Sequence, residues 1–68
     1  MRHDTEVFDI RNCEILRRTD KALLVETSDG DEVWVPQSVC EEIHSDPNAK
    51  GQDWLVVQAW WARKAGLT

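Results

Sequence analysis

The sequence predicts an α+β fold, a small antiparallel β-sheet of three to five strands with a short helix and a C-terminal α-helix packed on it. An Asp29-Gly30 pair separates two runs rich in Val, Leu and Trp, a pattern typical of a β-hairpin. Near the end, an apolar run leads into a segment with two basic residues followed by Gly66, as at many helix C-termini. At 68 residues, the chain has the length of one small domain. Residues 1–68 are therefore expected to form a single unit, with residues 1–5 frayed.

The first half of the chain predicts three strands. Residues 6–16 are expected to be extended and to bend near Arg11 and Asn12, where the apolar alternation is imperfect. The hairpin strands are predicted at residues 22–27 and 32–36, since Gly30 tolerates the positive φ that a tight primed turn demands. Pro36 should end the second hairpin strand, because proline lacks the N–H that a ladder requires.

The second half predicts two helices and a last strand. Ser38 and Glu41 have the spacing of a capping box and indicate a short helix over residues 39–44. Residues 54–57 contain no polar side chain, which favours a strand buried on both faces. A helix is predicted over residues 58–65, with Gly66 just beyond its end and Leu67 packing back on its last turn.

Charge is distributed unevenly along the chain. All thirteen carboxylates lie in the first 53 residues, whereas the last fifteen residues hold two basic side chains and three of the four tryptophans. The net charge is −5, and repulsion between such an acidic body and phosphate disfavours direct nucleic-acid binding. A local basic strip is conceivable from Arg11, Arg17, Arg18 and Lys21.

Residue types that carry catalysis are sparse. The two histidines, His3 and His44, have no spacing typical of a nucleophilic triad. Cys40 and His44 would supply only half of a zinc site, so neither enzyme activity nor a metal or other cofactor is predicted. Cys13 and Cys40 are too few for a disulfide framework and are expected to be reduced thiols in the cytoplasm. No apolar run reaches the ~20 residues of a membrane helix, and no secretion signal is evident at the N-terminus.

Residues 21–25, 33–38 and 60–67 carry a resemblance that covers residues 21–68. They resemble short proteins of bacteriophages and prophages, in which a hairpin with W-[IV]-P-x-S precedes a terminal W-x-x-x-K-x-G-L helix. Small size and acidic charge are also similar to anti-CRISPR proteins as a class. This resemblance implies a non-enzymatic, phage-derived inhibitor that binds a host nucleic-acid-binding complex, such as a CRISPR effector, in the host bacterial cytoplasm.

An acidic face is the predicted partner-binding surface. Side chains two apart on a strand share one face at a spacing of roughly 6.5–7 Å, which can imitate a row of phosphates and attract a basic channel. Adjacent helical residues point about 100° apart, so one helical tryptophan should be exposed enough to act as an anchor. The predicted partner-binding residues are Glu26, Asp29, Asp31, Glu32, Glu41, Glu42 and Trp61.

Other interpretations stay open at this point. An ordinary solvated surface would also account for the carboxylates, and Trp34 is expected to pack in the core. A phage accessory protein would instead bind single-stranded nucleic acid through Trp60 or Trp61 and the basic strip. A third possibility is a module that binds only a phage protein through an exposed tryptophan. The chain is expected to be a monomer or a small homo-oligomer.

Overall fold

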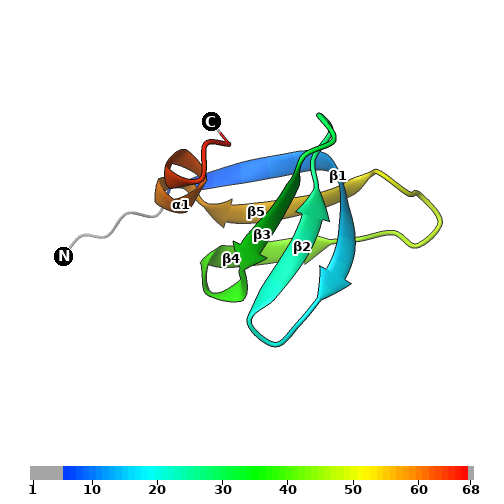
Figure 1. Cartoon of the computed structure of the whole chain (residues 1–68), viewed down its shortest axis with the longest axis horizontal. Helices are drawn as coiled ribbons and strands as arrows, with labels where there is room; N and C mark the ends of the chain where they lie inside the picture. Colours follow the sequence, from blue (N-terminus) through cyan, green and yellow to red (C-terminus); the bar gives the residue numbers. More distant parts are fainter. Residues whose placement is uncertain (1–5, 68) are drawn as a thin grey trace.

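The computed structural model describes residues 6–67, which form a five-stranded antiparallel sheet and one short α-helix (Figure 1). The strand order in the sheet is β3-β2-β1-β5-β4. This arrangement confirms the expected α+β class, while the expectation that residues 1–5 fray lies outside the described residues. The elements in chain order are β1 (Val7–Arg18), β2 (Ala22–Glu26), β3 (Glu32–Pro36), a single 3-10 turn (Gln37–Val39), β4 (Cys40–His44), β5 (Asp53–Gln58) and α1 (Ala59–Lys64).

β1 is the strand that organises the sheet. Its first half pairs with β5 and its second half with β2, and the register shifts between Ile10 and Cys13. Asn12 lies at this shift with a φ of 55°, a left-handed conformation that Asn adopts more readily than most residues. The bend therefore falls where the sequence predicted it.

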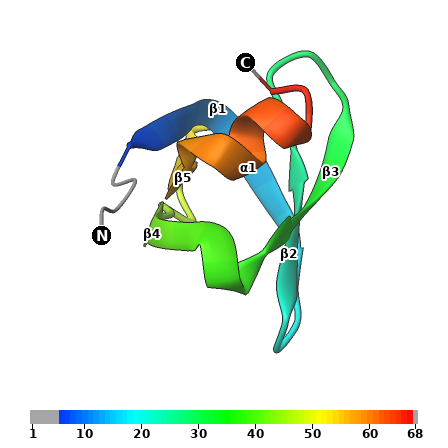
Figure 2. The same ribbon diagram turned by 90° about the vertical axis from the view of Figure 1, so that its left-hand side faces the viewer.

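The sheet curls around its core. β3 and β4 lie at opposite edges of the sheet, yet only the three-residue turn Gln37–Val39 joins them. A flat sheet would place these edges several strands apart, at about 4.8 Å per strand, so the two edges must approach each other at that turn. Figure 2 shows this curvature, with α1 lying across one end.

The concave side of the sheet holds the core, and α1 covers it with Ala59 and Ala62. Where β1 bends, the buried carboxylate of Asp53 accepts the backbone N–H of Ile15 at 2.9 Å. This bond satisfies a donor at a point where the strand ladder is irregular. The largest fully buried side chains are Cys13, Leu23, Val25, Val35, Leu55 and Val57. β5 is buried on both faces at Leu55, Val56 and Val57, as predicted.

The β2–β3 hairpin is also confirmed, although its turn is of a different type. The Thr27 N–H donates to the Asp31 carbonyl at 2.8 Å, and the Gly30 N–H donates to the Thr27 carbonyl at 2.9 Å. Gly30 has a φ of 89°. This geometry is a three-residue hairpin loop with glycine at the left-handed position, not a two-residue primed turn.

The helix α1 ends as its sequence predicted. Gly66 has a φ of 81°, the Leu67 N–H donates to the Ala62 carbonyl at 2.9 Å, and the Gly66 N–H donates to the Arg63 carbonyl at 3.2 Å. These two bonds form a Schellman motif. Leu67 consequently turns back and packs against the core.

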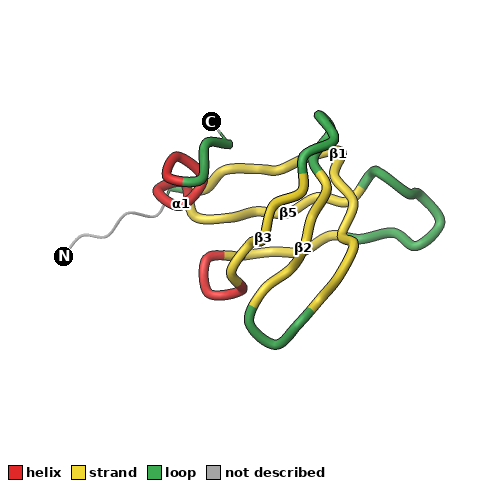
Figure 3. The backbone as a smooth tube through the Cα atoms, viewed as in Figure 1, coloured by secondary structure: helices red, strands yellow, loops and turns green. Residues whose placement is uncertain are grey.

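The helix predicted over residues 39–44 is wrong, because these residues form the end of the 3-10 turn and the strand β4 (Figure 3). No side-chain bond caps the turn, so the Ser38–Glu41 capping box does not form. In β4, Cys40 stands opposite Val57 and Ile43 opposite Leu55. Pairing with β5 satisfies the open edge of that buried strand, whereas an isolated six-residue helix is marginal.

The expected burial of Trp34 is also wrong, since 51% of this residue is exposed. Val33 and Val35 face the core, and successive strand residues point to opposite faces. Trp34 therefore points to the outer face, where about half of its surface is exposed.

Candidate partner-binding site

The β2–β3 loop, the first half of β1 and the chain after α1 enclose a cavity of about 290 Å³. Its apolar lining comes from Phe8, Ile10, Val33 and Leu67. Ligand pockets usually measure roughly 300–1,000 Å³. The cavity therefore has room for about one side chain of a partner.

Charged side chains line the same cavity. Asp29 and Asp31 come from the hairpin loop, and Asp9 and Arg11 come from β1. The Arg11 guanidinium lies 3.3 Å from the Asp9 carboxylate, and both side chains are exposed. Three carboxylates and one guanidinium leave a formal charge of −2 around an apolar floor. We call this feature, defined by Asp9, Asp29, Asp31 and its apolar lining, the acidic pocket.

The two hairpin glutamates lie elsewhere, on the outer face of the sheet. Glu26 stands opposite Glu32 on β3 and opposite Glu14 on β1. Residues directly opposite in an antiparallel sheet share a face, with Cβ atoms roughly 4.5–5.5 Å apart. Glu14, Glu26 and Glu32 therefore form a row across three strands, which we call the glutamate row.

Sequence reasoning found part of each feature. It identified Asp29, Asp31, Glu26 and Glu32, but it missed Asp9 and Glu14. The signal for Glu14 is the strand register, which the irregularity between Ile15 and Arg17 makes hard to count from the sequence. Asp9 lies on the half of β1 that pairs with β5, and its place in the same lining as the hairpin loop depends on contacts between distant parts of the chain.

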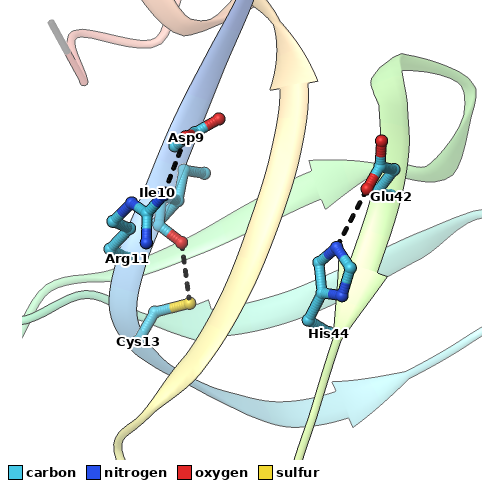
Figure 4. A network of polar contacts seen from close by, with 6 residues as sticks. All are labelled: Asp9, Ile10, Arg11, Cys13, Glu42 and His44. Atoms are coloured by element: carbon cyan, nitrogen blue, oxygen red, sulfur yellow. Dashed lines mark hydrogen bonds and ion pairs between the residues drawn. The ribbon is translucent and has the colours of Figure 1, made fainter.

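Glu41 and Glu42 are not part of this acidic region. β3 leads away from the hairpin loop, and β4 begins only after the turn at its far end. Glu42 accepts a bond from His44 Nε2 at 2.9 Å (Figure 4), and Glu41 accepts one from the Gln58 side chain at 2.9 Å. The structure thus divides the six predicted carboxylates among three places.

The predicted basic strip is divided as well. The Arg11 guanidinium lies 4.2 Å from the centroid of the Trp54 ring, and His44 stacks on Trp54 with ring centroids 4.4 Å apart. Figure 4 shows Arg11 beside Asp9 on β1 and His44 beside Glu42 on β4. Arg11 therefore borders both the acidic pocket, beside Asp9, and the outer face of β5 and β4, beside Trp54. Arg17 and Arg18 lie instead at the far end of β1, and Lys21 follows in the turn to β2.

The two helical tryptophans differ in exposure. Trp60 is 45% exposed, whereas the predicted anchor Trp61 is half-buried and packs against the core. The expectation that both cannot be buried is confirmed. α1 adjoins the start of β1, where the Ala59 N–H donates to the Glu6 carbonyl at 3.1 Å. Trp60 and Trp61 are therefore at the opposite end of β1 from Arg17 and Arg18 (Figure 1).

The thiols lie apart from the acidic pocket. Cys13 is buried and Cys40 half-buried, and both are free. Burial, followed by the charge of Asp53, raises the pKa of Cys13 to about 11. Burial is also the main cause of the raised pKa of Cys40. Among residues 6–67, no three His, Cys, Asp or Glu side chains gather in a way that would hold a metal ion.

Comparisons with known proteins add no family or function. No protein-family model matches the chain, and no curated protein and no solved structure matches it either. Within residues 6–67, no helix has the length and apolar composition needed to cross a bilayer. Function must therefore be inferred from the arrangement of the side chains.

Proposed function

We propose that this chain is a non-enzymatic protein-binding domain whose acidic pocket receives a basic side chain of a partner. The observation that carries this proposal is the placement of Asp9, Asp29 and Asp31 around an apolar floor. A lysine or arginine can lay its alkyl stem on such a floor while its charged end reaches the carboxylates. Neither the carboxylates alone nor the apolar floor alone would distinguish this surface from an ordinary solvated one.

The partner class follows from the charge. A surface rich in Lys and Arg is most often one that binds nucleic acid, and an acidic ligand on that surface would exclude the nucleic acid. The proposed function is therefore inhibition of a nucleic-acid-binding complex. A bacterial CRISPR effector is the specific target suggested by the resemblance to phage proteins. Charge complementarity would make association fast and sensitive to salt.

The nucleic-acid-binding alternative has less support from the geometry. It needs exposed tryptophans beside a basic groove, yet Trp60 and Trp61 lie at the opposite end of β1 from Arg17 and Arg18. If the partner is a phage protein, the chain would still be a non-enzymatic binding domain. Only the identity of the captured protein distinguishes this alternative from the inhibitor.

The proposal is tested with two charge-reversed variants. Asp29→Lys/Asp31→Lys alters the pocket, and Glu41→Lys/Glu42→Lys makes the same change in net charge on β4. Each variant and the wild-type chain serve as bait in a nuclease-treated bacterial lysate that contains a CRISPR effector complex, and the beads are washed at low and high salt. We expect the wild type and the β4 variant to retain the effector at low salt. The amount of effector retained by the pocket variant should be at least about tenfold lower, as expected when a charged contact is broken.

A second step examines the mechanism of inhibition. Guide-matched DNA added to the captured effector should release the wild-type chain, because both compete for one basic surface. Retention of the effector by the pocket variant would contradict the acidic-pocket proposal. Direct capture of DNA or RNA by the purified chain, lost in Arg17→Glu, would favour the nucleic-acid-binding alternative instead.

A further inference from the structure

The acidic pocket follows one edge of β1. Phe8, Asp9, Ile10 and Arg11 are consecutive residues, and all of them line the pocket. Phe8 and Ile10 pack in the core, whereas the side chains of Asp9 and Arg11 are 38% and 60% exposed. Successive strand residues point to opposite faces of a sheet. A run of consecutive residues can therefore line one cavity only where that cavity lies along the edge of the strand.

This edge of β1 is unpaired within the described part of the chain. On the other edge of the strand, β5 pairs with residues 7–10. On the pocket side, the ladder between β1 and β2 stops at the pair of Glu14 with Glu26, and the neighbours of β1 in the sheet are β2 and β5. An unpaired strand edge presents N–H and C=O groups that can pair with another strand.

The opposite wall of the pocket does not complete the ladder. That wall is the hairpin loop, whose backbone groups bond to one another, from the Thr27 N–H to the Asp31 carbonyl and from the Gly30 N–H to the Thr27 carbonyl. Among residues 6–67, no backbone hydrogen bond outside the strand ladders joins residues 8–11 to this loop or to the chain after α1. The pocket is therefore a gap between the start of β1 and the hairpin loop.

The length of the open edge suits a segment of backbone. One side chain can fill the cavity, but the edge that borders it continues from Phe8 to Arg11, about 13 Å at roughly 3.3 Å per residue. This distance exceeds the reach of a single lysine or arginine side chain. An extended segment of a partner would use the whole edge, as in the addition of a strand to an exposed sheet edge.

The two sides of the edge determine which segment fits. A strand paired with β1 shares the faces of β1, so its alternate side chains point inward and outward. Those on the inward side meet Phe8 and Ile10, and those on the outward side lie beside Asp9. Because three carboxylates and one guanidinium line the pocket, the outward side chains should be basic. The complementary segment is one in which apolar and basic residues alternate.

We propose that the open edge of β1 at residues 8–11 binds an extended segment of the partner by strand addition, with its alternate side chains apolar and basic. This inference rests on the proposed function of the acidic pocket and adds the way in which the partner is held. Main-chain hydrogen bonds to β1 supply affinity, and the apolar floor and the carboxylates select the sequence.

The first test measures binding of the full chain to a blocked hexapeptide in which valine and lysine alternate. Three further versions carry methyl groups on the backbone nitrogens of the valines, of the lysines, or of both. Successive N–H groups of a strand point to opposite edges, so the first two versions each keep one edge able to donate. We expect at least one of these two to bind like the parent peptide. The version methylated on both edges should bind at least about tenfold more weakly.

The second test locates the contact by amide hydrogen exchange. Peptide binding should slow exchange at least about tenfold at those N–H groups of residues 8–11 that do not bond to β5. A blocked single lysine is the matched control, because it can enter the pocket but has no strand to add. It should leave the exchange of these groups unchanged, and both ligands should leave the outer edge of β4 unchanged.

Two charge variants separate this inference from the proposed function. The parent peptide should bind Asp29→Lys/Asp31→Lys more weakly than Glu41→Lys/Glu42→Lys, and equal binding would overturn the proposed function and this inference together. Pocket-dependent binding that survives methylation of both edges would overturn strand addition alone, leaving a pocket for a side chain. Unchanged exchange at residues 8–11 in the peptide complex, or a parent peptide that does not bind the wild-type chain, also overturns strand addition.

Discussion

At the scale of single residues, Cys13 shows how the bend of β1 affects chemistry. Its Sγ donates to the Asp53 carbonyl at 3.3 Å and to the Ile10 carbonyl at 3.6 Å, and only 1% of the residue is exposed. Burial first, and then the charge of Asp53, favour the neutral thiol over the thiolate and raise the pKa of Cys13. Reactivity is therefore not the role of this cysteine, since the thiolate is the reactive form.

The raised pKa of Cys13 predicts a loss of stability at alkaline pH. An unfolded thiol ionises near its ordinary value of 9.0, whereas the folded one keeps its proton until about pH 11. Between these values the folded state holds a proton that the unfolded state has lost, so the free energy of unfolding falls as pH rises. The contribution is fully present below pH 9, and its loss by pH 11 is on the order of 2 kcal/mol.

Urea unfolding of the wild type and of Cys13→Ala at several pH values checks this prediction. The substitution should lower stability at neutral pH, because it removes a buried side chain. Its unfolding free energy should then decline less steeply between pH 9 and pH 11. The other alkaline groups are the same in both proteins, so parallel pH profiles would rule out the assigned effect of Cys13.

At the scale of elements, the sequence correctly predicted the features that depend on a few neighbouring residues, namely the hairpin loop and the end of α1. The hairpin loop needs Gly30 and the end of α1 needs Gly66, and both glycines adopt positive φ. Such local patterns do not indicate which distant strands pair with one another. The Ser38–Glu41 spacing indicated a helix, yet residues 40–44 join the sheet because β5 offers them an unpaired buried edge.

The candidate site shows the same division between local and distant information. Asp29 and Asp31 adjoin the predicted turn and were found from the sequence, whereas Asp9 joins them from a distant part of the chain. Trp34 was assigned to the core because so small a domain is expected to use its large aromatic side chains for core packing. Which face is covered depends on how the whole sheet curls, and this is not encoded in the strand itself.

The bend of β1 itself gives a prediction at Asn12, whose φ is 55°. Asn12→Gly should leave stability unchanged or slightly raised, because glycine adopts this conformation without strain. Asn12→Val should lower the free energy of unfolding by about 1–2 kcal/mol, since the Cβ of an L-residue clashes there. Thermal or urea unfolding measures both changes.

The control is Asn48→Val, the same substitution at an exposed loop position that is not among the positive-φ residues. It should change stability far less than Asn12→Val. If the two valine variants lose the same stability, the left-handed conformation at Asn12 is not what holds the bend.

At the scale of the whole molecule, charge separates along the β2–β3 hairpin. The loop end is acidic, whereas the end of β1 and the turn to β2 carry Arg17, Arg18 and Lys21 against the single carboxylate Asp20. The net charge of −5 describes only the excess and hides this polarity. On the function proposed above, the acidic pocket at the loop end serves a basic partner.

The acidic pocket also predicts binding to a basic polymer. Beads coated with poly-lysine should bind the wild-type chain at low salt. Trp34→Ala keeps its net charge and its pocket, so it should bind the beads to the same extent.

The two charge variants separate the pocket from net charge. Asp29→Lys/Asp31→Lys should bind the beads less than Glu41→Lys/Glu42→Lys, which has the same net charge. Equal bead binding by the two charge variants would show that net charge, and not the pocket, binds the basic polymer.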